Sequence, residues 1–132
     1  YYYLSEYDSN GNEIKAEFYE GDGKLESAYT SEYDANGNII KQDRRDSNGE
    51  LTDYWLYTYN ADGQKIREES YDETGKRWEY TQYLYDDTGK RIKEENYGYD
   101  STLQSYRLYI YDADGAEIRY ENYDSDGTMI CY

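Results

Sequence analysis

The sequence has no histidine, no proline and no valine, and it has a single cysteine among 132 residues. Without histidine it lacks the most common general base, metal ligand and pH switch. Without proline, no strand is interrupted by a missing backbone donor. The lone Cys131 cannot form an internal disulfide, and we interpret it as an ordinary strand residue. A chain without a disulfide framework fits the cytosol and also a bacterial surface.

Ordinary core residues are also scarce, because leucine, isoleucine and phenylalanine together make up 16 of the 132 residues. Combined with a net charge of −16, this composition is typical of disordered chains, which bury too little apolar surface to fold. Tyrosine changes that expectation. The 22 tyrosines and 2 tryptophans are large and favour strands, so any core that the chain forms should be aromatic.

Basic residues are few, with 14 Lys and Arg against 30 Asp and Glu. Nucleic acids and anionic membranes require basic patches, so we expect neither as a partner, whereas cationic and neutral partners stay open. No apolar run approaches the length of a membrane helix, and none resembles a signal peptide. We therefore expect no membrane insertion.

A repeat of 26 residues organises what is present. Each copy opens with a tyrosine and carries a glycine four residues later and an isoleucine seven residues later. The opening tyrosines are Tyr7, Tyr33, Tyr59, Tyr85 and Tyr111. The chain is therefore one repeat array, 1–132, with a partial copy at 1–6, full copies at 7–32, 33–58, 59–84 and 85–110, and a partial copy at 111–132.

Turn residues divide every repeat into two short segments. Asp or Asn can bond the backbone two residues on, and a closing Gly takes positive φ, which suits a three-residue hairpin loop with a bulge. Ten such turns leave no room for helices but fit strands such as 64–71 and 76–85. The sequence predicts an all-β fold, an antiparallel β-hairpin meander of about eleven strands. We expect this repeat ribbon to be elongated and coiled.

The turn chemistry also predicts a register. With Asn60 opposite Gln64, Ile66 would lie opposite Thr58 on one neighbouring strand and Gln82 on the other. Each period would then be offset by two residues from the next, which makes the sheet coil.

The same register assigns side chains to two faces. The opening tyrosines would share one face with Tyr57, Tyr83 and Tyr109 and with a ladder of Lys or Arg and Glu, such as Arg67 with Glu69. The isoleucines and Tyr54, Tyr80 and Tyr106 would lie on the other face.

An aromatic ladder is the main candidate binding site. Tyr57, Tyr83 and Tyr109 recur on every second strand, about 9.5 Å apart at ordinary strand spacing. Trp55 shares their predicted face. Such rings suit the stacking of sugar rings at a spacing comparable to a disaccharide. The alternative is that the rings pack on each other and on Lys or Arg stems.

Other chemistry has simpler explanations. Carboxylate pairs could serve a glycosidase, but acids in a periodic pattern are typical of a solvated face. The runs that begin at Asp112 and Asp124 are similar to calcium loops, yet they lack the spacing and terminal Glu of an EF-hand. We expect no enzymatic activity, no cofactor and no metal site.

The motif Tyr-Asp-x-x-Gly-x-x-Ile, seen at 33–40 and 111–118, resembles the YD repeats of the bacterial Rhs and teneurin-like family. In that family such repeats form β-hairpin ribbons on bacterial surfaces or spiral shells around toxins. The array looks more like those of secreted or lipid-anchored surface proteins. The resemblance implies an extracellular or bacterial cell-surface location.

Two functions follow as hypotheses. The first is a non-enzymatic spacer or adhesive module that binds a glycan or a protein through the tyrosine-rich face. The second is a subunit of an extracellular fibre, because a partial strand at 128–132 would run directly into one at 3–7 of the next copy. The assembly edges in that case are Tyr3, Tyr7, Thr128 and Tyr132.

Overall fold

The computed structural model describes residues 1–131, and its eleven strands form one antiparallel sheet in which strand order follows the sequence. The strands are β1 (Tyr2–Tyr7), β2 (Glu13–Tyr19), β3 (Leu25–Tyr33), β4 (Ile39–Arg45), β5 (Leu51–Tyr59), β6 (Lys65–Asp72), β7 (Arg77–Tyr85), β8 (Arg91–Gly98), β9 (Leu103–Tyr111), β10 (Glu117–Asp124) and β11 (Met129–Cys131). The described residues contain no helix. The predicted all-β meander is confirmed.

All ten turns share one hydrogen-bond pattern. After β5, the Asn60 N–H donates to the Gln64 carbonyl at 2.9 Å, and the Gly63 N–H donates to the Asn60 carbonyl at 3.1 Å. The closing glycine takes φ between 77° and 85° in nine turns, and Ser101 takes its place in the tenth at φ 64°. The predicted hairpin loops are confirmed, including the turn that lost its final glycine.

The detailed register differs from the prediction by one residue on the strand after each opening-tyrosine turn. Arg67, and not Ile66, lies opposite both Thr58 and Gln82, because Ile66 is the extra residue of a β-bulge. The two-residue offset is nevertheless confirmed, since Thr58 and Gln82 are 24 residues apart along a 26-residue repeat.

The bulge also corrects the predicted faces. Arg67 and Glu69 lie opposite Thr58 and Leu56, so the basic and acidic ladder shares a face with Tyr54 and not with Tyr57. An inserted residue shifts the later side chains of its own strand to the opposite face, and the pattern of residue types alone did not reveal the insertion. We call the two sides the Trp55 face, which carries Trp55, Tyr57, Tyr83 and Tyr109, and the Tyr80 face, which carries Tyr54, Tyr80 and Tyr106.

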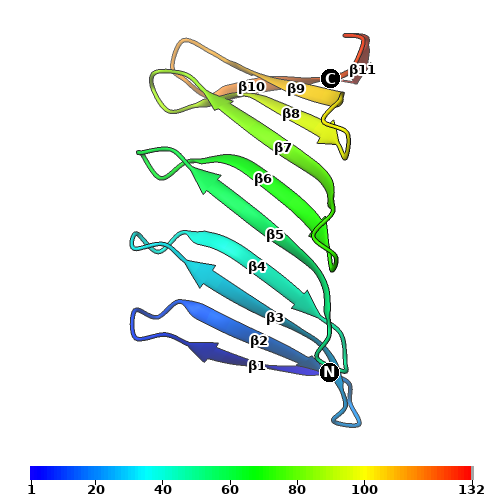
Figure 1. Ribbon diagram of the computed structural model, residues 1–132. Coiled ribbons are helices and arrows are strands. Elements are labelled where there is room, and N and C mark those ends of the chain that lie inside the picture. The colour runs from blue at the N-terminus through cyan, green and yellow to red at the C-terminus, as the bar shows by residue number, and fades with distance from the viewer. Residues whose placement is uncertain (132) are drawn as a thin grey trace.

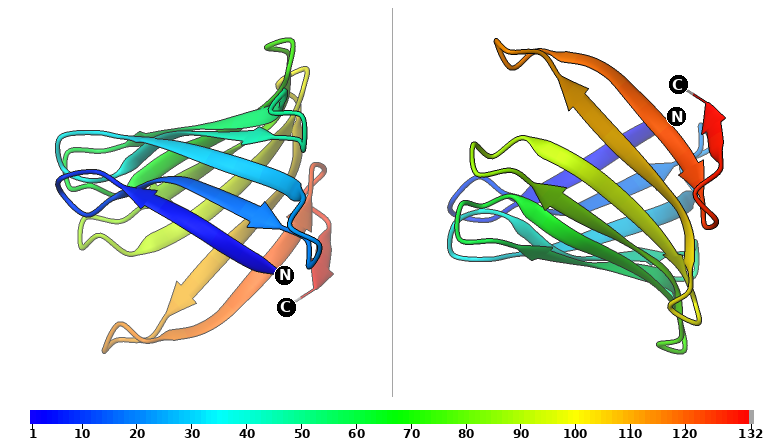
Figure 2. Two further views of the ribbon diagram at one scale, coloured as in Figure 1. Left: turned by 90° about the horizontal axis from the view of Figure 1, so that it is seen from below. Right: turned by 90° about the horizontal axis from the view of Figure 1, so that it is seen from above.

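The ribbon is elongated and coiled, as predicted. In Figure 1 the strands follow one another from β1 at one end to β11 at the other. Figure 2 looks along that direction and shows the strands on a curve, so that the two ends of the chain lie close together in projection. The sheet therefore winds about its long axis while keeping β1 and β11 apart, as accumulated twist and offset require.

The sheet is a single layer with little buried surface. Among the described residues, the buried apolar side chains are Ala16, Ala28 and Tyr80, and the buried polar ones are Asp53, Ser70 and Glu121. Stability must then come from the backbone ladder and from cross-strand side-chain pairs. The described part of the chain has no helix long and apolar enough to cross a membrane.

The opening tyrosine of the later repeats ties each copy to the one before it. The Tyr59 hydroxyl donates to the Ile39 carbonyl at 2.7 Å, and Tyr33, Tyr85 and Tyr111 make the equivalent bond 20 residues back. This bond satisfies a phenol at the point where the bulge kinks the neighbouring strand. The motif tyrosine is thus a fold residue, and the acid or amide after it caps the turn.

Candidate functional site

The structure places the four predicted ligand-binding residues together on the Trp55 face. Trp55 and Tyr57 lie two residues apart on β5, Tyr83 lies on β7 and Tyr109 lies on β9. All four are partly exposed. The sheet therefore presents an aromatic row that crosses alternate strands, because strand residues two apart share a face and the repeat fixes their level.

Cations lie between the rings of this row. The Lys65 ammonium lies 5.2 Å from the centre of the Tyr57 ring and 5.5 Å from that of Tyr83. The Arg91 guanidinium lies 5.4 Å from the Tyr83 ring and 4.8 Å from the Tyr109 ring. Tyrosine and cation therefore alternate along the row, at distances typical of cation–π contacts. The sequence prediction named the rings but not these two cations, although both recur at the repeat spacing.

Carboxylates complete the row. Glu68 pairs with Lys65 at 2.6 Å, and Glu94 pairs with Arg91 at 3.6 Å. The Tyr109 hydroxyl donates to Glu94 at 3.0 Å. Each repeat along the row therefore presents an aromatic ring, a basic side chain that can donate hydrogen bonds and a carboxylate that can accept them.

Burial keeps these phenols protonated. Burial, and after it the charge of Glu68, raises the pKa of Tyr57 to about 12. Burial followed by Glu68 and Glu94 raises the pKa of Tyr83 in the same direction. Both hydroxyls are therefore neutral hydrogen-bonding groups at physiological pH.

An ion pair between the half-exposed Arg44 and the buried Asp53 flanks Trp55, and the sequence prediction missed it. Arg44 donates from Nε to Asp53 Oδ1 at 2.8 Å and from Nη2 to Asp53 Oδ2 at 2.6 Å. Asp53 is 2% exposed, and the Arg44 guanidinium lies 5.9 Å from the centre of the Trp55 ring. The signal was available, because Arg and Asp occupy positions that hold small or neutral residues in most other copies.

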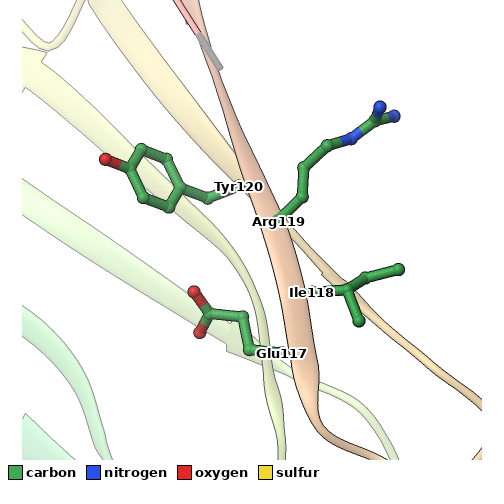
Figure 3. A pocket seen from close by; sticks show the side chains of 4 residues that line it. All are labelled: Glu117, Ile118, Arg119 and Tyr120. Atoms are coloured by element: carbon green, nitrogen blue, oxygen red, sulfur yellow. The ribbon is translucent and has the colours of Figure 1, made fainter.

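The Trp55 face continues to β10. Tyr120 lies opposite Tyr109, and Figure 3 shows Tyr120 and Glu117 projecting to one side of the strand. Ile118 and Arg119 project to the other side (Figure 3), as expected where a bulge residue and its successor share a face. These four residues line a shallow hollow at this end of the sheet.

The predicted assembly edges lie at opposite ends of the sheet. Tyr3 and Tyr7 are exposed on β1, where the Tyr3 ring stacks on Phe18 at 5.9 Å between ring centres. Thr128 belongs to the last turn, because its N–H donates to Asp124 and its carbonyl accepts from the Asp124 N–H. Tyr132 lies outside the described residues.

The acidic residues in the runs that are similar to calcium loops form hydrogen bonds within their own turns. One carboxylate oxygen of Asp112 accepts from the Asp114 N–H at 3.0 Å and from the Ala116 N–H at 2.9 Å. Among the side chains that the structure describes, no group of three or more potential ligands is placed to hold a metal ion. The absence of a metal site stays a prediction, as does the absence of catalysis.

Comparison with known proteins supports the fold. A family model for a protein of unknown function, DUF2963, matches residues 1–44. No curated protein matches the chain. The Photorhabdus luminescens Tc holotoxin pore is similar over 97% of this chain and 6% of its own, at 22% identity and a TM-score of 0.68. A porin-like protein from Bacteroides uniformis is similar over 92% of this chain and 48% of its own, at 21% identity and a TM-score of 0.51.

The chain therefore spans a small part of the first of these proteins and about half of the second. At such identities the likeness concerns the fold alone. The sheet is a YD-repeat-like β-structure, in agreement with the resemblance of its sequence motif.

Proposed function

We propose that this chain is a non-catalytic repeat module, secreted or held at a bacterial surface, which spaces and adheres by binding a neutral glycan or a protein. The observation that carries the proposal is the row on the Trp55 face, where Tyr57, Tyr83 and Tyr109 alternate with Lys65 and Arg91. The extracellular location is proposed from the motif resemblance.

The physical argument rests on preorganisation. Aromatic rings on a sheet offer contact area at low entropic cost, and the cations already restrict their rotamers. Glu68 and Glu94 supply acceptors for sugar hydroxyls or peptide N–H groups. Because the row repeats at a fixed spacing, weak contacts add up on an extended ligand.

The test is a screen against neutral glycans and candidate proteins, followed by titration calorimetry on any ligand found. Tyr57→Ala, Tyr83→Ala and Tyr109→Ala should each weaken binding modestly, and the triple variant should abolish it while its far-UV circular dichroism persists. Leu56→Ala, Leu84→Ala and Leu108→Ala change the Tyr80 face and serve as the matched control. Turnover of the bound ligand should not be detected.

Two results would contradict the proposal. Unchanged binding in the triple alanine variant would move the site away from this row. If the triple alanine variant instead unfolds, the three rings are fold residues, and their packing on each other and on Lys or Arg stems replaces the binding site.

A second candidate function is end-to-end assembly into a fibre. The observation that favours it is that β1 and β11 each pair on one side only within the described residues, so that unpaired backbone groups remain. Purified protein would then form filaments at high concentration. An excess of a peptide with the sequence of β1, Tyr2–Tyr7, should cap growth, and a monomeric sedimentation profile at all concentrations would exclude it.

A further inference from the structure

The Tyr80 face carries four tyrosine pairs whose rings lie face to face across neighbouring strands. The ring-centre distances and interplanar angles are 5.0 Å and 7° for Tyr2–Tyr19, 4.9 Å and 3° for Tyr54–Tyr71, 4.5 Å and 6° for Tyr80–Tyr97, and 4.8 Å and 10° for Tyr106–Tyr123. Each pair is a directly opposite pair of the ladder. The backbone thus holds two phenol rings parallel and in contact at one level of the repeat.

A carboxylate accepts a hydrogen bond from the phenol in three of these pairs. The Tyr19 hydroxyl donates to Glu17 at 3.0 Å, Tyr97 donates to Glu95 at 3.0 Å and Tyr123 donates to Glu121 at 2.7 Å. The Tyr97 phenol is protonated at neutral pH, and burial followed by the Glu95 hydrogen bond raises its pKa above the ordinary value. Removing an electron from such a phenol requires that the proton leave too, and the carboxylate is placed to receive it.

We propose that the stacked pairs are sites of oxidative cross-linking, in which a peroxidase-type one-electron oxidant using hydrogen peroxide joins two tyrosines into dityrosine. Each phenol loses one electron to the oxidant and one proton, which for Tyr97 goes first to Glu95. The two phenoxyl radicals couple through a carbon ortho to each oxygen, and the hydrogens on those carbons move to the oxygens as the rings become aromatic again. Two electrons and two protons leave in total and reduce one hydrogen peroxide to two waters.

The structure also says which tyrosines should not couple. Along the Trp55 face, Lys65 lies between Tyr57 and Tyr83, so two radicals there are held apart by a cation. The opening tyrosines of the later repeats, such as Tyr59, donate to backbone carbonyls, which do not take up a proton at neutral pH. Coupling should therefore be concentrated in the four stacked pairs of the Tyr80 face.

The pairing of β3 with β4 lacks the two tyrosines and serves as an internal negative control. Ala28 and Arg45 occupy the positions that Tyr54 and Tyr71 hold one repeat later, so no link is possible between β3 and β4 at this level. The expected product has covalent links across β1–β2, β5–β6, β7–β8 and β9–β10. Each link would close a loop of the chain and raise the melting temperature.

The experiment treats dilute protein with a peroxidase and hydrogen peroxide, then maps links by proteolysis and mass spectrometry. The expected result is a monomer with dityrosine fluorescence and a loss of two hydrogens per link, with the linked peptides falling within the four stacked pairs. The same treatment of the urea-unfolded chain should scatter the links. Links mainly among the exposed Tyr1, Tyr3, Tyr7 and Tyr99, or mainly between molecules, would overturn the proposal.

Two variants test the roles of stacking and of the carboxylate. Tyr97→Phe should abolish the Tyr80 link and leave the Tyr106–Tyr123 link in the same molecule. In Glu95→Gln the side-chain amide can still accept the hydrogen bond but takes up no proton. The yield of the Tyr80–Tyr97 link should therefore fall several-fold relative to that of the Tyr106–Tyr123 link. Glu94→Gln on the other face is the matched control. An unchanged ratio in Glu95→Gln would overturn the role of the carboxylate.

Discussion

Two parts of this sheet fill equivalent positions with different chemistry. In the pairing of β7 with β8, the buried Tyr80 stacks on Tyr97. In the pairing of β3 with β4, Ala28 lies opposite Arg45 and no ring stack is possible. Both pairings keep the antiparallel ladder and a bulge at the turn. The comparison teaches that the backbone and the turns carry the repeat, and that no single side-chain pair is required to continue it.

The opposite face changes at the same place. Arg44 of β4 forms its bidentate pair with Asp53 of β5, whereas Asn96 of β8 lies opposite Ser105 of β9. An aromatic stack is thus missing on one face where an ion pair to a buried carboxylate has been added on the other. We infer that charge-assisted hydrogen bonds partly offset the lost ring contact around β4.

The largest expected effect comes from removing the stack. Tyr80→Ala should lower the free energy of unfolding by about 3 kcal/mol, since it deletes a buried ring and leaves Tyr97 without its partner. Equilibrium denaturation in urea measures this loss. Ala28→Gly is the matched change in the region without a stack, and it should cost much less. Equal losses in the two variants would contradict the comparison.

The ion pair between Arg44 and the buried Asp53 should give the next largest effect. Asp53→Asn keeps the shape but removes the charge that Arg44 contacts, so the free energy of unfolding should fall by about 2 kcal/mol. Glu79→Gln changes the equivalent, exposed position of β7 and should be nearly neutral. Thermal melts of both variants check this. A neutral result for Asp53→Asn would mean that the pair adds nothing to the stability of β4.

Restoring the stack should have a smaller effect of opposite sign. The double change Ala28→Tyr with Arg45→Tyr recreates the pairing seen at Tyr54 and Tyr71, and a ring pair is worth about 1 kcal/mol beyond its area. Urea denaturation of the double variant should show a gain in stability that neither single change provides. A loss in the double variant would show that the space around Ala28 is closed to a ring.

The smallest effect is a difference in pH dependence. The pKa of Tyr97 is raised above its ordinary value of 10.0, chiefly by burial and then by the hydrogen bond to Glu95. The folded state therefore holds this proton more tightly, and its contribution is complete below pH 10.0 and is lost as the pH rises above that value. Tyr97→Phe should flatten the fall in stability at alkaline pH. Arg45→Lys, which alters the equivalent position, should not.

Much of this fold could be predicted because it depends on the turn residues and on the repeat period. The glycines at positive φ and the Asp or Asn before them fixed nine of the ten turns, and the spacing between turns fixed the strands. The exception at Ser101 was visible as a missing glycine. The candidate row was also predictable in part, because Tyr57, Tyr83 and Tyr109 recur at one level of the repeat.

The bulge at Ile66 could not be predicted from the same pattern. The energy of the bulge depends on how both neighbouring strands twist and pair. The register without the bulge and the observed register both repeat every 26 residues, so the period does not distinguish them. That single inserted residue moved Arg67 and Glu69 to the Tyr80 face. Lys65 precedes the inserted residue and keeps its place opposite Tyr59, so a cation still lies between Tyr57 and Tyr83.

The sequence by itself determined the all-β class, the repeat, the turns and the strand count, because these depend on local backbone preferences and on spacing along the chain. Only the tertiary structure decided which side chains meet. The ring stacks, the pair of Arg44 with Asp53 and the bonds from opening tyrosines to carbonyls 20 residues back all join different strands. Their partners are set by register and by the coil of the sheet, and both arise from the cooperation of many strands.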